Sequence, residues 1–208
     1  DRSLPFTKIG DTTLIDRAVE FILNFSPITQ LILTTPDQDV IEYAKDKWES
    51  EISIIHRPKK LSYINSPLEP VVQHTLSNID LGPDYDFFML TSLESPFKKS
   101  QVIESGINIM QIFDVDTVVG VRPERSLLLN HDGKGMKFLV EQGEFRLERN
   151  ELFKMVPGYL IRDFKSFKTS GKLFGDIVGH VMFDQLSAFR ITNQLECNIA
   201  DFLAKKNI

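Results

Sequence analysis

Asp86-Phe87-Phe88-Met89-Leu90-Thr91 is the stretch of sequence that decides the fold. Four consecutive residues in it are apolar, so a strand formed here would present apolar side chains to both faces of a sheet. Strands of that kind lie in the middle of parallel sheets that helices cover on both faces. The stretch therefore predicts a buried central strand in an α/β protein.

Helix and strand patterns alternate on both sides of this stretch. Short apolar runs bounded by turn residues predict strands, and apolar residues three or four positions apart predict amphipathic helices. The predicted strands are residues 30–35, 52–55 and 116–121, and the predicted helices are residues 14–25, 37–50, 69–79 and 100–113. Repeated β-α units of this kind indicate a three-layer α/β fold with a mostly parallel sheet.

The alternation is less regular after residue 121. Residues 127–140 predict two strands around the turn HDGKG at 131–135, which is a hairpin signal. Because the chain shows no repeat, low-complexity tract or linker, we expect a single domain over residues 1–208. Residues 127–149 are expected to form a β-hairpin arm within that domain.

The last part of the chain predicts two further strands, at 155–161 and 177–183, and a short helix at 163–168. Residues 193–205 predict a closing amphipathic helix. The residues expected on its inward face are Leu195, Ile199, Phe202 and Leu203.

Composition and motif content exclude several classes of protein. A formal net charge of −5 argues against a general nucleic-acid-binding surface, which needs an excess of Lys and Arg. Cys197 is the only cysteine, so no intrachain disulfide is possible. No apolar run approaches the roughly 20 residues that span a bilayer, and no signal peptide is recognisable. A hydrolase elbow, a Walker-type phosphate loop and zinc-ligand spacing are also absent from the sequence. We therefore expect a cytoplasmic protein without a membrane or nucleic-acid partner.

Several short patterns occur in an order that is typical of one enzyme family. RPKKLS at 57–62 is followed by HTL at 74–76, and TSLESPF at 91–97 ends the predicted central strand. RNE at 149–151 and VPG at 156–158 come later. The series resembles the patterns R-P-x-x-L-A, H-A-L, L-Q-P-T-S-P-L, R-Q-D and N-G-A of the acylneuraminate cytidylyltransferase (CMP-sialic acid synthetase) family. The resemblance covers nearly the whole chain, and the order is more specific than any one pattern.

This resemblance implies a Rossmann-like nucleotide-diphospho-sugar transferase fold with a small β arm, usually in a homodimer. It implies transfer of CMP from CTP to an acidic sugar, such as a sialic or other nonulosonic acid, in cell-surface polysaccharide synthesis. Pyrophosphate would be released and Mg²⁺ would be the cofactor. Positioning and charge neutralisation dominate such phosphoryl-transfer reactions.

The resemblance also implies a nucleotide site. Arg2 lies in a segment similar to the tail of the family's phosphate cradle, and the chain is expected to lack the beginning of that cradle. Arg2 and Lys8 would contact the triphosphate as the catalytic cations. Arg57, Asn65 and Ser66 would contact the nucleotide.

The sugar would contact Ser92, Ser95 and Arg149 if the family pattern is carried over. Ser92 replaces the glutamine of the family's L-Q-P-T-S-P, and the segment after Leu61 is less polar than in the family. These departures indicate either a different substrate or a loss of catalysis.

The stretch of this sequence that corresponds to the family's metal-binding motif departs most from the family pattern. Two carboxylates of the motif S-I-D-I-D hold magnesium in the family, but Arg190 and Thr192 stand at the matching positions. Because Mg²⁺ prefers oxygen ligands, this change predicts a weakened site. Asp176 and Asp184 remain as candidate ligands.

Two alternatives to the enzyme remain open. A catalytically inactive nucleotide-sugar-binding or dimerisation domain of the same fold would explain the altered metal motif. A nucleotidyltransferase for another sugar would explain the altered sugar-contacting residues.

Overall fold

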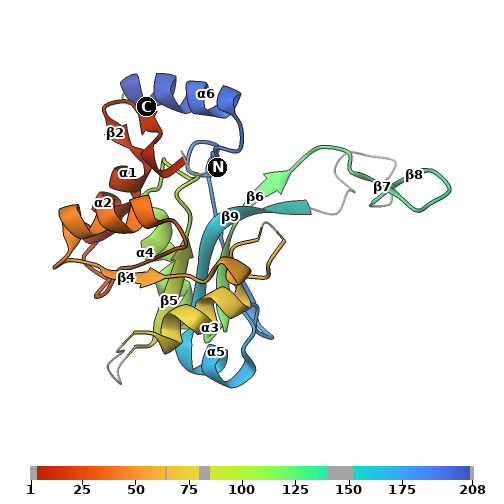
Figure 1. The fold of residues 1–208 in the computed structure, drawn as a ribbon. Coiled ribbons are helices and arrows are strands. Elements are labelled where there is room, and N and C mark those ends of the chain that lie inside the picture. Colours follow the sequence, from red (N-terminus) through yellow and green to blue (C-terminus); the bar gives the residue numbers. More distant parts are fainter. Residues whose placement is uncertain (1–3, 64, 80–84, 140–151, 207–208) are drawn as a thin grey trace.

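The computed structural model describes residues 4–63, 65–79, 85–139 and 152–206. Within them, the largest sheet has four strands in the order β10-β6-β9-β5 (Figure 1). Their bounds are β5 (Phe87–Thr91), β6 (Thr117–Glu124), β9 (Leu152–Asp163) and β10 (Val178–Met182). β10 is parallel to β6, and β9 is antiparallel to both β6 and β5. Therefore β5, β6 and β10 all point in one direction, and their carboxyl ends lie at one edge of the sheet.

A second sheet contains β3 (Ile32–Thr35) and β4 (Ser53–His56), which are parallel. It packs against α1 (Leu14–Leu23) and α2 (Gln38–Trp48), which surround a core that includes Ile15, Val40 and Trp48. The side chain of Thr13 caps α1 by accepting a hydrogen bond from the amide of Asp16. These elements confirm the β-α units that the sequence predicted between residues 14 and 55.

Helices cover both faces of the four-stranded sheet (Figure 1). On one face, α4 (Ser100–Phe113) and the end of α1 contribute Ile103, Ile107 and Ile22 to a core that includes Ile161 of β9. On the other face, α3 (Glu69–Ser77) and α5 (Phe164–Ser170) pack against β6 and β9 through a separate core. The predicted three-layer α/β architecture is therefore confirmed.

β5 is not as buried as the sequence predicted. Its first four residues are half-buried and Thr91 is exposed, although they contribute to the cores on both faces. Among the described residues, β5 pairs only with β9 and so forms an edge of its sheet. Tyr85 donates a hydrogen bond to Gln30 at 2.8 Å, which joins the segments that precede β5 and β3.

The first described residues lie against the last helix (Figure 1). They form η1 (Leu4–Phe6), β1 (Lys8–Ile9) and β2 (Thr12–Thr13), which pack beside α6 (Gln194–Lys205). Ile9 shares a core with Ala200, and the amide of Gly10 donates to Asp201 at 3.0 Å.

The predicted inward face of α6 is wrong for three of its four residues, because Leu195, Ile199 and Phe202 are exposed and only Leu203 is partly buried. Leu195 and Phe202 are 68% and 59% exposed, whereas Ala200 is fully buried. α6 covers the small β1–β2 hairpin rather than a broad sheet, so only a narrow stripe of the helix is in contact with the core.

The predicted hairpin after residue 127 is present as β7 (Leu129–His131) and β8 (Met136–Phe138), which are antiparallel. It extends away from the sheets (Figure 1), and its side chains are exposed. Residues 140–149 of the predicted arm lie outside the described residues.

A short turn of helix, η2 (Lys59–Leu61), follows β4. None of the described helices is both long and apolar enough to cross a membrane.

Candidate functional site

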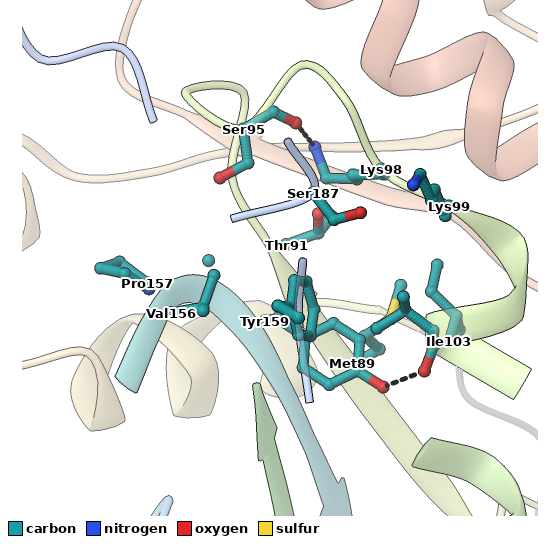
Figure 2. Close-up of a pocket in the computed structure, with 13 residues that line it drawn as sticks. Met89, Thr91, Ser95, Lys98, Lys99, Ile103, Val156, Pro157, Tyr159 and Ser187 are labelled. Atoms are coloured by element: carbon teal, nitrogen blue, oxygen red, sulfur yellow. Dashed lines mark hydrogen bonds between the residues drawn. The ribbon is translucent and has the colours of Figure 1, made fainter. Parts of the chain in front are cut away.

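The carboxyl ends of β5, β6 and β10 form the edge of the sheet at which α/β proteins of this kind bind ligands. A small pocket lies there, between the loop that follows β5, a bulge in β9 and the segment that follows β10 (Figure 2). The residues of these three segments that line it are Ser95, Lys98, Lys99, Val156, Pro157, Gly158, Tyr159, Phe183 and Ser187. The candidate site is therefore built from three separate parts of the sequence.

The bulge in β9 brings this strand against the loop after β5. Val119 pairs with Leu160 and Val121 pairs with Met155, so residues 156–159 lie opposite a single residue of β6. Gly158 has a φ of +77°, and a Cβ atom on it would lie 2.5 Å from Cβ of Ser92. Only glycine fits this conformation and this contact, so VPG at 156–158 shapes the pocket wall.

Lys98 holds the loop after β5 in place. Its ammonium group donates to the backbone oxygen of Ser92 at 2.7 Å. It also donates to the backbone oxygen of Ser95 at 2.6 Å (Figure 2). Among the described residues, no carboxylate forms an ion pair with it. Burial without a counter-charge lowers the pKa of Lys98 from 10.5 to about 8. The cation at the wall of this pocket therefore loses its proton near pH 8.

Replacing Lys98 with methionine is expected to change how stability depends on pH. The folded protein loses the Lys98 proton near pH 8, whereas the unfolded chain keeps it up to about pH 10.5. The stability of the parent protein should therefore rise between pH 8 and 10.5 relative to Lys98→Met. Thermal unfolding at half-unit pH steps measures the difference. Lys99→Met, which keeps Lys98 and alters an exposed neighbour, should follow the pH dependence of the parent protein over this range, and parallel curves for the parent protein and Lys98→Met would contradict the prediction.

Asp184 follows β10 at the same edge of the sheet. Its carboxylate accepts hydrogen bonds from the ammonium of Lys99 at 2.6 Å and the amide of Ser187 at 2.8 Å. These bonds lower the pKa of Asp184 to about 2. Its oxygens are therefore already engaged with donors.

Asp176 lies at the other end of β10, because this strand begins at Val178 and ends at Met182. A five-residue strand is about 16 Å long, so Asp176 and Asp184 are too far apart to bind one ion. The described residues contain no cluster of three His, Cys, Asp or Glu side chains that could hold a metal.

Arg190 takes part in an ion pair where the family pattern has a carboxylate. Its guanidinium bonds the carboxylate of Glu94 through Nε at 2.5 Å and forms a salt bridge through a second nitrogen. The amide of Ile191 donates to the backbone oxygen of Glu94 at 2.8 Å, which fixes this segment beside the loop after β5. Thr192 donates to the carboxylate of Glu196 through both its amide and its hydroxyl. The two positions therefore hold donors rather than metal ligands.

The predicted nucleotide-contacting residues do not line this pocket. Arg57 follows β4, and its amide donates to the backbone oxygen of Thr35 at 2.9 Å. Its Nε is buried and has no hydrogen-bond partner among the described residues. Burial lowers the pKa of Arg57, while the nearby charge of Asp37 opposes that effect. A half-buried guanidinium whose Nε has no hydrogen-bond partner among the described residues thus lies at the carboxyl end of the parallel β3–β4 sheet.

The other residues singled out from the sequence are distributed as follows. Lys8 is exposed on β1 beside α6, and Asn65 and Ser66 lie in the connection between β4 and α3. Arg2 and Arg149 lie outside the described residues. Of the predicted set, Ser92 and Ser95 belong to the pocket loop, and Asp184 lies at its rim next to Ser187.

Sequence analysis did not single out Lys98, Tyr159 or Ser187. The hydroxyl of Tyr159 donates to the backbone oxygen of Val102, and its ring packs edge-on against Phe183. A signal for Lys98 was available, because Lys98-Lys99 follows the Ser95-Pro96 turn directly at a strand end.

Comparison with known proteins adds evidence on the fold. No protein-family model and no curated protein matches the sequence. Many solved structures are similar in fold, and cytidylyltransferases are among them. A 4-diphosphocytidyl-2C-methyl-D-erythritol synthase from Anaerococcus prevotii has 15% identity over 97% of this chain and 90% of its own, with a TM-score of 0.69. The 2-C-methyl-D-erythritol 4-phosphate cytidylyltransferase of Thermus thermophilus has 13% identity over 99% and 95% of the two chains, with a TM-score of 0.62.

A third structure, another 4-diphosphocytidyl-2C-methyl-D-erythritol synthase, has 8% identity over 96% of this chain and 92% of its own, with a TM-score of 0.72. The names of these proteins refer to an erythritol compound, not to the acidic sugar that the sequence resemblance implies. The chain therefore has the fold of cytidylyltransferases over nearly its whole length.

Proposed function

We propose that this chain is a cytidylyltransferase-like domain that binds CTP and an acidic sugar and transfers CMP to the sugar. The observation that carries the proposal is the pocket at the carboxyl edge of β5, where Ser92, Ser95 and Lys98 meet the β9 bulge. The likeness in fold to solved cytidylyltransferases supports the nucleotide class. The sequence resemblance to the acylneuraminate enzymes supports the acidic sugar.

The proposed reaction is an in-line displacement at phosphorus. A hydroxyl oxygen of the sugar forms a bond to the α-phosphorus of CTP, the bond from that phosphorus to the β-phosphate oxygen breaks, and pyrophosphate leaves with the electron pair. The hydroxyl proton passes to solvent. The domain would contribute mainly by positioning the two substrates and neutralising charge.

Individual residues have distinct parts in this proposal. Arg57 would contact the nucleotide, since its half-buried guanidinium has an unpaired Nε. Ser92 and Ser95 would contact the sugar from the loop after β5. Asn65 and Ser66 would contact the nucleotide beside Arg57. Arg2 and Lys8 would contact the triphosphate, and Arg149 would contact the sugar, as the family resemblance implies.

A magnesium ion held by the protein does not fit the described residues. Asp184 is engaged by Lys99 and Ser187, and Asp176 lies at the opposite edge of the sheet. Any magnesium at the site would be carried by the phosphates of CTP, and the proposal contains no step that requires a protein-bound ion.

A second candidate function is a catalytically inactive nucleotide-sugar-binding domain. The ion pair between Arg190 and Glu94 favours it, because a cation occupies a position at which the family has a metal ligand. Such a domain would bind CTP without releasing pyrophosphate.

One pair of assays separates the two functions. CTP binding is measured by calorimetry with and without magnesium, and pyrophosphate release is measured with CTP and N-acetylneuraminate. The transferase should bind CTP and release pyrophosphate only when the acidic sugar is present, with N-acetylmannosamine as the neutral control. Binding without release for every acidic sugar tested would favour the inactive domain, and absence of binding to any nucleotide would contradict both.

Arg57→Gln is expected to weaken CTP binding at least tenfold. The substitution removes a charge-assisted donor at a strand end, and a bond of that kind contributes about 1.5–3 kcal/mol. Lys60→Gln is the matched control, because Lys60 is an exposed cation three residues away that should leave the affinity unchanged. Equal affinity of Arg57→Gln and the parent protein would remove Arg57 from the site.

The proposed partner of the domain is a second copy of itself, as the family resemblance implies. The hairpin arm exposes Leu129, Met136 and Phe138, which are 46%, 61% and 52% exposed. Apolar side chains in such number on a projecting hairpin are typical of an interaction surface, so the homodimer is proposed to form through the arm.

A further inference from the structure

A second hollow lies at the carboxyl edge of the sheet, where β6 ends and the chain leaves β10. It is lined by Arg122, Pro123, Glu124, Arg125, Ser126, Phe183 and Gln185. Phe183 also lines the pocket described above, so the two hollows share this ring as part of their walls. Arg122 and Arg125 give the second hollow a basic lining.

Two cations face each other across the strands at this point. Arg122 of β6 pairs directly with Lys154 of β9 in the antiparallel register. Residues paired in this way have Cβ atoms about 4.5–5.5 Å apart and project from the same face, and like charges in this arrangement repel. No described carboxylate forms an ion pair with Arg122, Arg125 or Lys154. The protein therefore maintains a repulsive pair beside an open hollow.

Glu124 is the nearest acidic residue along β6, and its charge acts on both cations although it forms no described ion pair with either. Its carboxylate accepts a hydrogen bond from the amide of Ser126 at 2.8 Å. That bond is the main reason why the pKa of Glu124 is lowered, and the charges of Lys154 and Arg122 lower it further. Arg122, Arg125 and the engaged carboxylate of Glu124 thus line the hollow, and Lys154 lies opposite Arg122 in the strand register.

The aromatic ring of Phe183 forms a flat wall next to these cations. It lies so close to Gly120 that a Cβ atom there would approach a ring carbon to 2.5 Å. Gly120 and Arg122 are two residues apart on β6 and therefore project from one face of the strand. The Phe183 ring also packs edge-on against Tyr159, with ring centroids 5.0 Å apart, which fixes its orientation.

We propose that Arg122 and Lys154 bind the carboxylate of the acidic sugar, with the sugar ring against Phe183. The guanidinium fork of Arg122 matches the two oxygens of a carboxylate, and an anion between the two cations would relieve their repulsion. Arg125 lies at the rim and adds to the positive field. The proposal rests on the proposed function for the identity of the sugar, whereas the anion-binding pair depends only on the register of β6 and β9.

The test measures binding of N-acetylneuraminate to the full chain without nucleotide, by ligand-observed NMR at physiological salt. Arg122→Gln and Lys154→Gln are each expected to weaken binding at least tenfold. The methyl ester of N-acetylneuraminate, which lacks the negative charge, should bind at least tenfold more weakly than the acid to the parent protein. Lys165→Gln is the matched control, since it removes one exposed cation from α5 and should leave binding unchanged.

Several outcomes would overturn the inference. They are absence of acid binding to the parent protein, equal binding of the acid and its methyl ester, and equal loss in Lys165→Gln. Thermal unfolding shows whether Arg122→Gln and Arg122→Lys are folded. Arg122→Lys should retain part of the affinity. Acid binding that depends on Arg122 without pyrophosphate release would sustain this inference and remove the proposed transferase. Turnover by Arg122→Gln with an unchanged KM for the sugar would support the proposed transferase and remove this inference.

Discussion

Replacing Arg162 with leucine is expected to lower the free energy of unfolding by about 3–5 kcal/mol, the cost of removing one partner from a buried charged network. Arg162 lies near the end of β9 and is fully buried. Long charged side chains are almost never fully buried unless they are paired, so this residue must be supported by its contacts.

The guanidinium of Arg162 connects three segments at the amino edge of the sheet. Nε donates to the backbone oxygen of Lys172 at 3.1 Å, and one terminal nitrogen donates to that of Asp116 at 2.6 Å. The other terminal nitrogen donates to the hydroxyl of Ser166 at 2.8 Å. Leucine would leave these acceptors without their donors in a closed space, and each buried polar group left unpaired costs about 1–3 kcal/mol.

Urea unfolding monitored by circular dichroism measures the loss. Arg162→Lys should be intermediate, because a single ammonium cannot reach all three segments. Arg125→Leu removes an exposed arginine and should change stability by less than about 0.5 kcal/mol. A loss below about 1 kcal/mol in Arg162→Leu would show that the network contributes little.

The sequence predicted the helices and strands better than it predicted their burial. The periodicity of residues 100–113 and the apolar run at 86–91 depend on local sequence, and both elements form at these positions. The half-burial of β5 and the exposure of Leu195 and Phe202 depend on neighbouring elements, which periodicity does not specify. Arg162 illustrates the same limit, because an arginine before a helix cap is indistinguishable in sequence from a solvated one.

Part of the candidate site was predicted from the sequence. The part that was not predicted depends on how the strands pair. The pattern at 91–97 located the loop that contains Ser95, since it follows a strand directly. The separation of Asp176 and Asp184 follows from the strand predicted at 177–183, which places the two carboxylates at its opposite ends, as β10 does. The facing pair Arg122 and Lys154 could not be predicted, because the register passes through a bulge in β9.

Replacing Arg190 and Thr192 together with aspartate is expected to create a magnesium response that the parent protein lacks. The backbone bond between Ile191 and Glu94 holds residue 190 beside Glu94, so the substitutions would gather carboxylates where an ion pair now stands. These carboxylates repel one another without a cation, and Mg²⁺ supplies the charge and accepts their oxygens. The double variant should therefore be less stable than the parent protein in chelator and recover when magnesium is added.

The size of this response follows from linkage. Magnesium at ten times its Kd stabilises the folded state by about 1.4 kcal/mol, which corresponds to a rise of roughly 3–5 °C in Tm for a chain of this size. The parent protein should shift by less than about 1 °C, and so should Arg190→Asn with Thr192→Asn, which places no new negative charge at the site. Potassium chloride at matched ionic strength separates specific binding from screening. If the aspartate variant and the asparagine variant responded alike, the segment at 190–192 would have no latent metal-binding geometry, and its likeness to the family's metal motif would be limited to position in the sequence.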